Sequence, residues 1–174
     1  VLLFRGLLEA AGKEGADRLN QGTFYLASAL RAAGAEVVLS DAKISRFMRE
    51  PREREDLARI LKTHPDITLV ALSLYDAYFE DASALVSFIR ERTSARIAIG
   101  ALMPTRDPES ALLHLSGVDF IGRGAGEELL PRLAALAGPF DDAAQGALLA
   151  LDGVLAIDGG RVYWAGAENV LRVP

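Results

Sequence analysis

The sequence predicts an α/β protein built around a parallel β-sheet. Five short apolar runs alternate with five segments of helical spacing, which is typical of successive strand–helix units. The run at 67–72 is almost entirely apolar, which indicates a central strand covered on both faces. The 174 residues are 51% hydrophobic and 25% charged, an ordinary globular composition. We expect a three-layer, flavodoxin-like or Rossmann-like open parallel five-stranded sheet in the order 2-1-3-4-5, extended by a C-terminal β-hairpin.

The first two units occupy the first third of the chain. The run 1–4 is the first strand, and 22–33 has apolar residues at helical spacing after a loop rich in Gly, Ala and charge. The run 35–39 is the second strand. The charged segment 43–64 has apolar residues along one helical face, and Pro51 lies where a helix could begin. Its Arg and Glu residues indicate a solvated helix face.

Three more units follow in the same rhythm. The apolar positions of each helical segment recur three and four residues apart, so that they form one buried face. Thr105 or Asp107 is a suitable N-cap for the second of these helices. The expected strands are 67–72, 96–99 and 118–121, and the expected helices are 81–92, 107–115 and 126–136.

The pattern changes after Gly138. Residues 139–145 have the composition of a linker. The apolar runs 153–156 and 161–164 flank an Asp-Gly-Gly turn at 158–160, which predicts a β-hairpin.

Two regions are therefore expected, an α/β domain at 1–138 and a linker with a hairpin at 139–174. The sequence begins inside a predicted strand, and its last residues, VLRVP, show no pattern typical of a chain terminus. We expect it to be a domain excised from a longer protein.

Charge and composition exclude several classes of function. The net charge of −5 and the pI of about 5.1 argue against a nucleic-acid partner. No apolar run approaches the roughly 20 residues that a membrane helix needs. The absence of cysteine excludes disulfides and an iron–sulfur cluster held by this chain, and it is compatible with the cytoplasm, where we expect the protein.

The ends of the predicted strands contain the candidate site, because parallel α/β sheets bind ligands at the carboxyl ends of their strands. After the fifth strand, the segment GRGAGE at 122–127 places three alternating glycines before a helix N-terminus. After the fourth strand comes GALMPT at 100–105, and after the third comes Ser73-Leu74-Tyr75-Asp76. The glycines could instead form a simple tight turn, and Ser73 could be a cap.

The residues at the same positions exclude several other families, because the motifs of those families are absent. A phosphoreceiver domain needs acidic residues after the first and third strands and a Lys after the fifth, where this chain has Arg5-Gly6, Ser73 and Gly122-Arg123. The loop after the first strand lacks the hydroxyls that a flavin phosphate needs, and there is no P-loop. His64 and His114 fall in helical patterns, so we expect no catalytic residue and no metal ligand in this chain.

The strand ends together resemble the cobalamin-binding domain that precedes the barrel of many radical S-adenosylmethionine (radical SAM) enzymes. The resemblance covers most of the chain, in YLASALRAAG at 25–34, PDITLVALS at 65–73 and above all VDFIGRGAGEE at 118–128. The family usually shows Gly-Glu-Gly-Glu in the last segment, so Ala125 replaces the first Glu, and its Gly-Gly after the fourth strand is Gly100-Ala101 here. The hairpin would lead into the barrel.

The resemblance implies a cobalamin cofactor bound by the strand ends. Classical cobalamin domains carry Asp-x-His-x-x-Gly after the second strand, and many of the radical-enzyme relatives lack its His. Here Lys43 stands at the place of the His and Arg46 at that of the Gly, so no histidine ligand to cobalt is expected from this motif. S-adenosylmethionine and a 4Fe-4S cluster are expected only in the absent barrel, the partner domain to which cobalt would be presented for radical methyl transfer. The implied contacts are Ser73, Leu74, Tyr75, Gly100, Ala101, Leu102, Thr105, Gly122, Arg123, Gly124, Gly126 and Glu127.

Two alternatives remain open at this point. A domain of the same ancestry could have lost the cofactor and serve as a scaffold or a substrate-recognition surface, because methyl groups at Ala101 and Ala125 could crowd a corrin. An unrelated flavodoxin-like binder of a nucleotide or metabolite is the other.

Overall fold

The structure, a computed structural model, describes residues 1–4, 21–40, 47–74, 79–136, 147, 154–158 and 161–164. No helix within this described part is long and apolar enough to cross a bilayer. The strands are β1 (Leu2–Phe4), β2 (Val38–Ser40), β3 (Leu69–Ser73), β4 (Arg96–Gly100), β5 (Phe120–Gly122), β6 (Val154–Asp158) and β7 (Arg161–Trp164). The helices are α1 (Gln21–Ala32), α2 (Pro51–Thr63), α3 (Phe79–Arg90), α4 (Leu102–Arg106), α5 (Pro108–His114) and α6 (Gly126–Ala135).

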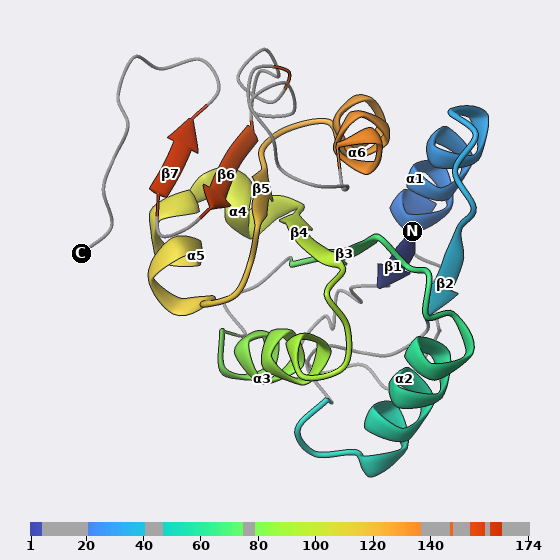
Figure 1. Cartoon of the computed structure of the whole chain (residues 1–174). Coiled ribbons are helices and arrows are strands. Elements are labelled where there is room, and N and C mark those ends of the chain that lie inside the picture. The colour runs from blue at the N-terminus through green and yellow to red at the C-terminus, as the bar shows by residue number, and fades with distance from the viewer. Residues whose placement is uncertain are drawn as a thin grey trace.

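The strands form one sheet in the order β2-β1-β3-β4-β5-β6-β7 (Figure 1). The pairs among β1 to β5 are parallel, with Ala71 of β3 opposite Ala98 of β4 and Ser73 opposite Gly100. β6 pairs with β5 in the antiparallel sense, and β7 pairs with β6. The expected α/β class with a parallel sheet is confirmed.

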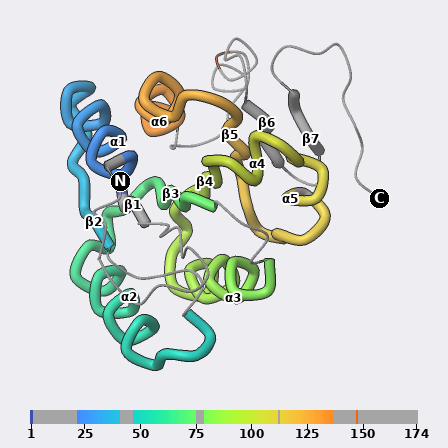
Figure 2. The backbone as a smooth tube through the Cα atoms, turned by 180° about the vertical axis from the view of Figure 1, so that it is seen from behind, coloured from blue at the N-terminus to red at the C-terminus, as the bar shows by residue number. Residues whose placement is uncertain are grey.

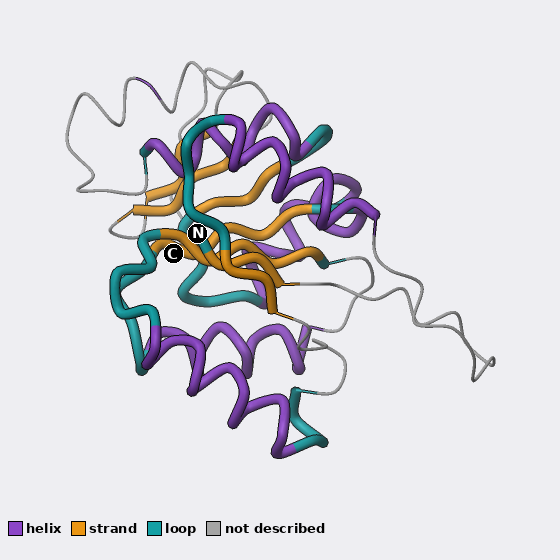
Figure 3. Tube along the Cα trace, turned by 90° about the vertical axis from the view of Figure 1, so that its right-hand side faces the viewer, coloured by secondary structure: helices purple, strands orange, loops and turns teal. Residues whose placement is uncertain are grey.

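Helices cover both faces of the sheet, which lies between two helical layers (Figure 3). α1 and α6 lie side by side on one face (Figures 1 and 2), and α2, α3 and α5 cover the other. Successive residues of β3 alternate between the two cores: Leu69 and Ala71 face α1 and α6, whereas Val70 and Leu72 face the other layer.

Most elements begin and end within a few residues of the expected positions, and α2 begins at Pro51. The short helix α4 was not expected, because a five-residue helix is too short to show a periodic apolar pattern. Its Pro104 is compatible with a first helical turn, where an N–H group has no partner to lose. Asp107 then caps α5, and hydrogen bonds from the Ser110 hydroxyl and N–H lower the pKa of its carboxyl.

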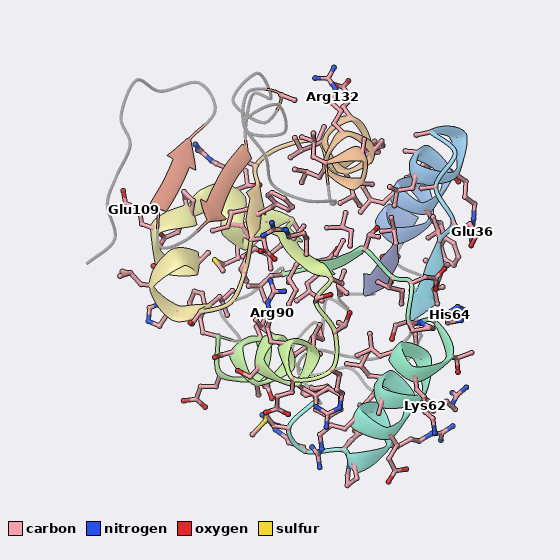
Figure 4. All side chains as sticks on the ribbon, viewed as in Figure 1. Glu36, Lys62, His64, Arg90, Glu109 and Arg132 are labelled. Carbon is pink, nitrogen blue, oxygen red and sulfur yellow. The ribbon has the colours of Figure 1, made fainter. Side chains whose placement is uncertain are left out.

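A buried carboxylate ties three elements together at the amino end of the sheet. Asp119, only 8% exposed, precedes β5 and accepts hydrogen bonds from Arg96 (2.9 Å), from the Ile97 N–H (2.7 Å) and from Arg90. Arg90 ends α3 and also donates to the carbonyls of Ala95 and Gly117, both at 2.7 Å. The network therefore fixes α3 against the starts of β4 and β5 (Figure 4 labels Arg90).

Replacing Asp119 with Ala would leave two arginines without their shared carboxylate. We expect Asp119→Ala to lower the free energy of unfolding by about 3 kcal/mol, the low end of the range for a broken buried pair, because both arginines are partly exposed. Urea unfolding measures this. The control is Asp56→Ala, which removes an exposed carboxylate paired with Arg59 on α2 and should cost less than about 1 kcal/mol. Equal losses in the two variants would contradict a structural role for the network.

Candidate functional site

A cavity of about 210 Å³ opens at the carboxyl ends of β3, β4 and β5. The first turn of α1 and the first turn of α6 form its walls, and the strands form its floor. This is the face of the sheet covered by α1 and α6 (Figure 1). The position agrees with the general rule that open α/β sheets bind ligands beyond the carboxyl ends of their strands.

The cavity exists because small residues face α1 and α6 near these strand ends. Ala71 and Ser73 of β3 lie beside Ala98 and Gly100 of β4, and Gly122 ends β5. The opposite face of the same strands carries leucine, isoleucine and valine, which fill the core under α2 and α3. A helix resting on short side chains cannot close the space above them, so an opening remains.

The three glycines at the end of β5 and in the turn that follows it have different roles. A Cβ at Gly122 would lie 2.9 Å from Cδ2 of Leu129, and a Cβ at Gly126 would lie 2.8 Å from Cδ2 of Leu26. Both glycines thus permit close packing of α6, against β5 and α1 respectively. Gly124 has φ +88° and open space around it, so its requirement is conformational. Only Gly124 leaves free backbone for a ligand to approach.

Thr105 joins the two turns at the edge of the cavity. Its hydroxyl donates to the Ala101 carbonyl (2.7 Å) and accepts from the Gly124 N–H (3.2 Å), and its carbonyl accepts from Nε of Arg123 (3.4 Å). Thr105 therefore positions the segments after β4 and β5 relative to each other.

Ala101 holds a backbone conformation that is almost confined to glycine. Its φ of 85° and ψ of −157° place it in a region that costs other residues about 1–3 kcal/mol. Strain of this kind at the rim of a cavity is typical of functional sites.

We expect Ala101→Gly to raise the free energy of unfolding by about 1 kcal/mol, which is the relieved strain less the larger chain entropy of unfolded glycine. Thermal unfolding measures the change. Ala125→Gly is the matched control, because Ala125 has an ordinary φ of −72° and should lose stability on the same substitution. A destabilised Ala101→Gly chain would contradict backbone strain at Ala101.

Seven of the twelve predicted contacts line the cavity, and they come from three separate segments. Leu74 is buried in the core under α3, Leu102 is 41% exposed, and Thr105 and Arg123 belong to the connected turns. Tyr75 lies outside the described residues, as do Lys43 and Arg46. The seven are Ser73, Gly100, Ala101, Gly122, Gly124, Gly126 and Glu127.

The inner part of the cavity was not predicted from the sequence. A usable signal was the run of small residues at alternate positions of β3 and β4, read against the large residues between them. For α1 no such signal existed, because its first turn reaches the cavity only through tertiary packing. The missed lining residues are Gly22, Thr23, Leu26, Ala71, Leu72, Ala98, Ile99, Ala125, Leu129, Leu130 and Leu133.

The polar groups at the rim can bind an uncharged or phosphate-bearing ligand. The N-cap position of α6 is Ala125, whose side chain makes no cap hydrogen bond, so the N–H groups of the first turn can meet a ligand. Glu127 lies in the same turn, where the helix dipole favours a carboxylate.

The described residues contain no metal centre, since no three His, Asp or Glu side chains among them gather to hold an ion. His64 lies at the end of α2 (Figure 4), and His114 stacks on Phe79 with 4.5 Å between ring centroids. Neither histidine lines the cavity.

A family model for the B12 binding domain matches residues 10–134, most of the chain. The chain belongs to this family. The matched range includes every predicted contact, and the match confirms the resemblance that the sequence showed. No curated protein matches the sequence of this B12-binding domain.

A similar solved structure is the radical S-adenosylmethionine methyltransferase TsrM from Kitasatospora setae, with cobalamin and a [4Fe-4S] cluster bound. The TM-score is 0.64 at 16% sequence identity, and the match covers 99% of this chain. The chain spans only 30% of the length of that protein. At this identity the likeness concerns the fold.

Proposed function

We propose that this chain binds cobalamin and presents it to a radical SAM domain of the same protein. The observation that carries the proposal is the cavity between α1, α6 and the ends of β3 to β5, within a chain that belongs to the B12-binding family. In this arrangement the corrin rests on the strand ends, and its nucleotide tail enters the cavity.

The residues around the cavity fit such a ligand. Gly100 and Gly124 have no side chains to hold a flat macrocycle away from the backbone. The free N–H groups at the start of α6 suit the phosphate of the tail. Leu26, Leu130 and Leu133 make the inner part apolar, which suits an aromatic base. When bound, cobalamin supplies a cobalt that can carry a methyl group.

This chain contributes binding and orientation rather than catalysis. Neither histidine lies at the cavity, and we propose that cobalt receives no histidine ligand from the segment containing Lys43. The division into a binding domain at 1–138 and a connecting region at 139–174 belongs to the same proposal, with S-adenosylmethionine and the 4Fe-4S cluster in the partner domain. The short span of this chain relative to TsrM supports such a partner.

Titration with hydroxocobalamin tests the proposal directly. We expect the purified chain to co-elute with about one cobalamin per chain in gel filtration, because one cavity of suitable size is described at the strand ends. The visible spectrum of the protein peak reports the ligands of cobalt. A folded chain that elutes without cobalamin would contradict the proposal and favour a scaffold that has lost the cofactor.

Filling the cavity should abolish this binding without unfolding the chain. Ala71 lies on the cavity floor, so Ala71→Leu places additional carbon atoms where the tail would lie. We expect at least a tenfold weaker affinity for cobalamin in equilibrium titration, about 1.4 kcal/mol or more.

Ser87→Leu adds the same side chain on the exposed surface of α3 and serves as the control. An Ala71→Leu chain that binds like the Ser87→Leu control would place the tail elsewhere.

A further inference from the structure

We propose that Thr105 is a positioning residue for cobalamin, because its hydroxyl holds Ala101 in the strained backbone conformation that the bound corrinoid needs. The free chain then carries the strain before the ligand arrives, so that binding does not have to supply it. This inference rests on the proposed function and assigns the preorganisation of the site to one side chain.

The backbone on both sides of Ala101 is fixed by the end of β3. The Leu74 N–H donates a hydrogen bond to the Gly100 carbonyl at 2.9 Å, and the Leu74 carbonyl accepts one from the Met103 N–H at 3.1 Å. Leu74 is itself buried in the core. The chain therefore has only Ala101 and Leu102 in which to turn from β4 into α4, and the turn includes a φ of 85° at Ala101.

Thr105 holds the other end of this turn. Its Oγ1 donates to the Ala101 carbonyl at 2.7 Å, and its N–H donates to the same oxygen at 3.2 Å. Because ψ sets the direction of a carbonyl, both bonds fix the ψ of Ala101 at −157°. A residue stays in such a strained region only where its surroundings over-determine the conformation. Loss of the hydroxyl, which makes the shorter of the two bonds, should let Ala101 relax.

The same hydroxyl connects Ala101 to the turn after β5. Oγ1 of Thr105 accepts a hydrogen bond from the Gly124 N–H at 3.2 Å, and Gly124 also has a positive φ, +88°. Ala101 and Gly124 both line the cavity. A held alanine has fewer alternative conformations than a glycine, so it makes a more rigid support for a ligand. Thr105 thus keeps two unusual backbone conformations in place at the rim of one site.

Thr105→Val tests the inference, because it removes the hydroxyl and nearly keeps the shape of the side chain. We expect the affinity for hydroxocobalamin in equilibrium titration to fall about tenfold, since Ala101 relaxes in the free chain and binding must restore its strain. Thr105→Ser keeps the hydroxyl and should bind like the parent chain.

A second substitution separates this role from a general structural one. Glycine adopts a positive φ without strain, so adding Ala101→Gly to Thr105→Val should recover most of the lost affinity. A hydroxyl that only stabilised the fold, or only touched the ligand, could not be replaced by a glycine four residues away. Urea unfolding of the same variants gives an independent readout: Ala101→Gly should stabilise the parent chain but not the Thr105→Val chain.

Thr63 provides the matched control. Its hydroxyl donates to the Arg59 carbonyl at 2.8 Å, also four residues earlier in the chain, at the exposed end of α2. Thr63→Val should change neither the affinity for hydroxocobalamin nor the effect of Ala101→Gly on stability.

Each contrary outcome has a distinct meaning. An unchanged affinity in Thr105→Val, or a loss that Ala101→Gly does not reverse, would overturn the inference while the proposed function stands. Equal stabilisation by Ala101→Gly in both backgrounds would also overturn it. So would a Thr105→Val chain that fails to fold, because the hydroxyl would then be required for the fold itself. A folded parent chain that binds no hydroxocobalamin would overturn the proposed function and the inference with it.

Discussion

Near the carboxyl ends of β3 and β4, alanine, serine and glycine face α1 and α6, whereas leucine, isoleucine and valine face α2 and α3. This difference in side-chain size is the constraint on which the rest of the molecule depends. The large face forms the main hydrophobic core and supplies most of the apolar burial. The small face leaves a cavity at one end of the sheet, so stability and binding are assigned to opposite faces of the same strands.

The two ends of the sheet are also specialised. At the amino end, Asp119 and its two arginines fix α3 to β4 and β5 through charged hydrogen bonds. At the carboxyl end, Ala101 is strained, Gly124 has a positive φ, and Thr105 holds the two turns together. The Asp119 network fixes the amino ends of β4 and β5, and the carboxyl ends of these strands form the site. Stability at the amino end therefore offsets the strain at Ala101 and the burial of the Thr23 hydroxyl, which has no hydrogen-bond partner among the described residues.

The glycine-rich turn illustrates the difference between a motif and its physical task. From the sequence, the three glycines after β5 were one candidate ligand-binding signal. In the structure, Gly122 and Gly126 admit Leu129 and Leu26, and only Gly124 remains open. The glycines that admit these leucines still contribute to the site, since they let α6 pack closely against β5 and α1, where it forms a wall of the cavity.

The sequence by itself determined the α/β class, the approximate limits of most elements and the carboxyl edge as the place of the site. These follow from apolar periodicity and from the rule for parallel sheets, both of which act over short stretches of chain. It also carried the family resemblance. The short helix α4 and the burial of Leu74 in the core were not predicted, because neither produces a periodic pattern in the sequence.

Only the tertiary structure decided which residues share the cavity. The first turn of α1 and the inner leucines of α6 lie about a hundred residues apart in sequence, and only the packing of α1 on α6 brings them together. The strain at Ala101 and the unpartnered hydroxyl of Thr23 are likewise invisible in the sequence. A backbone angle and a missing hydrogen bond are properties of an environment, and that environment is assembled from distant segments of the chain.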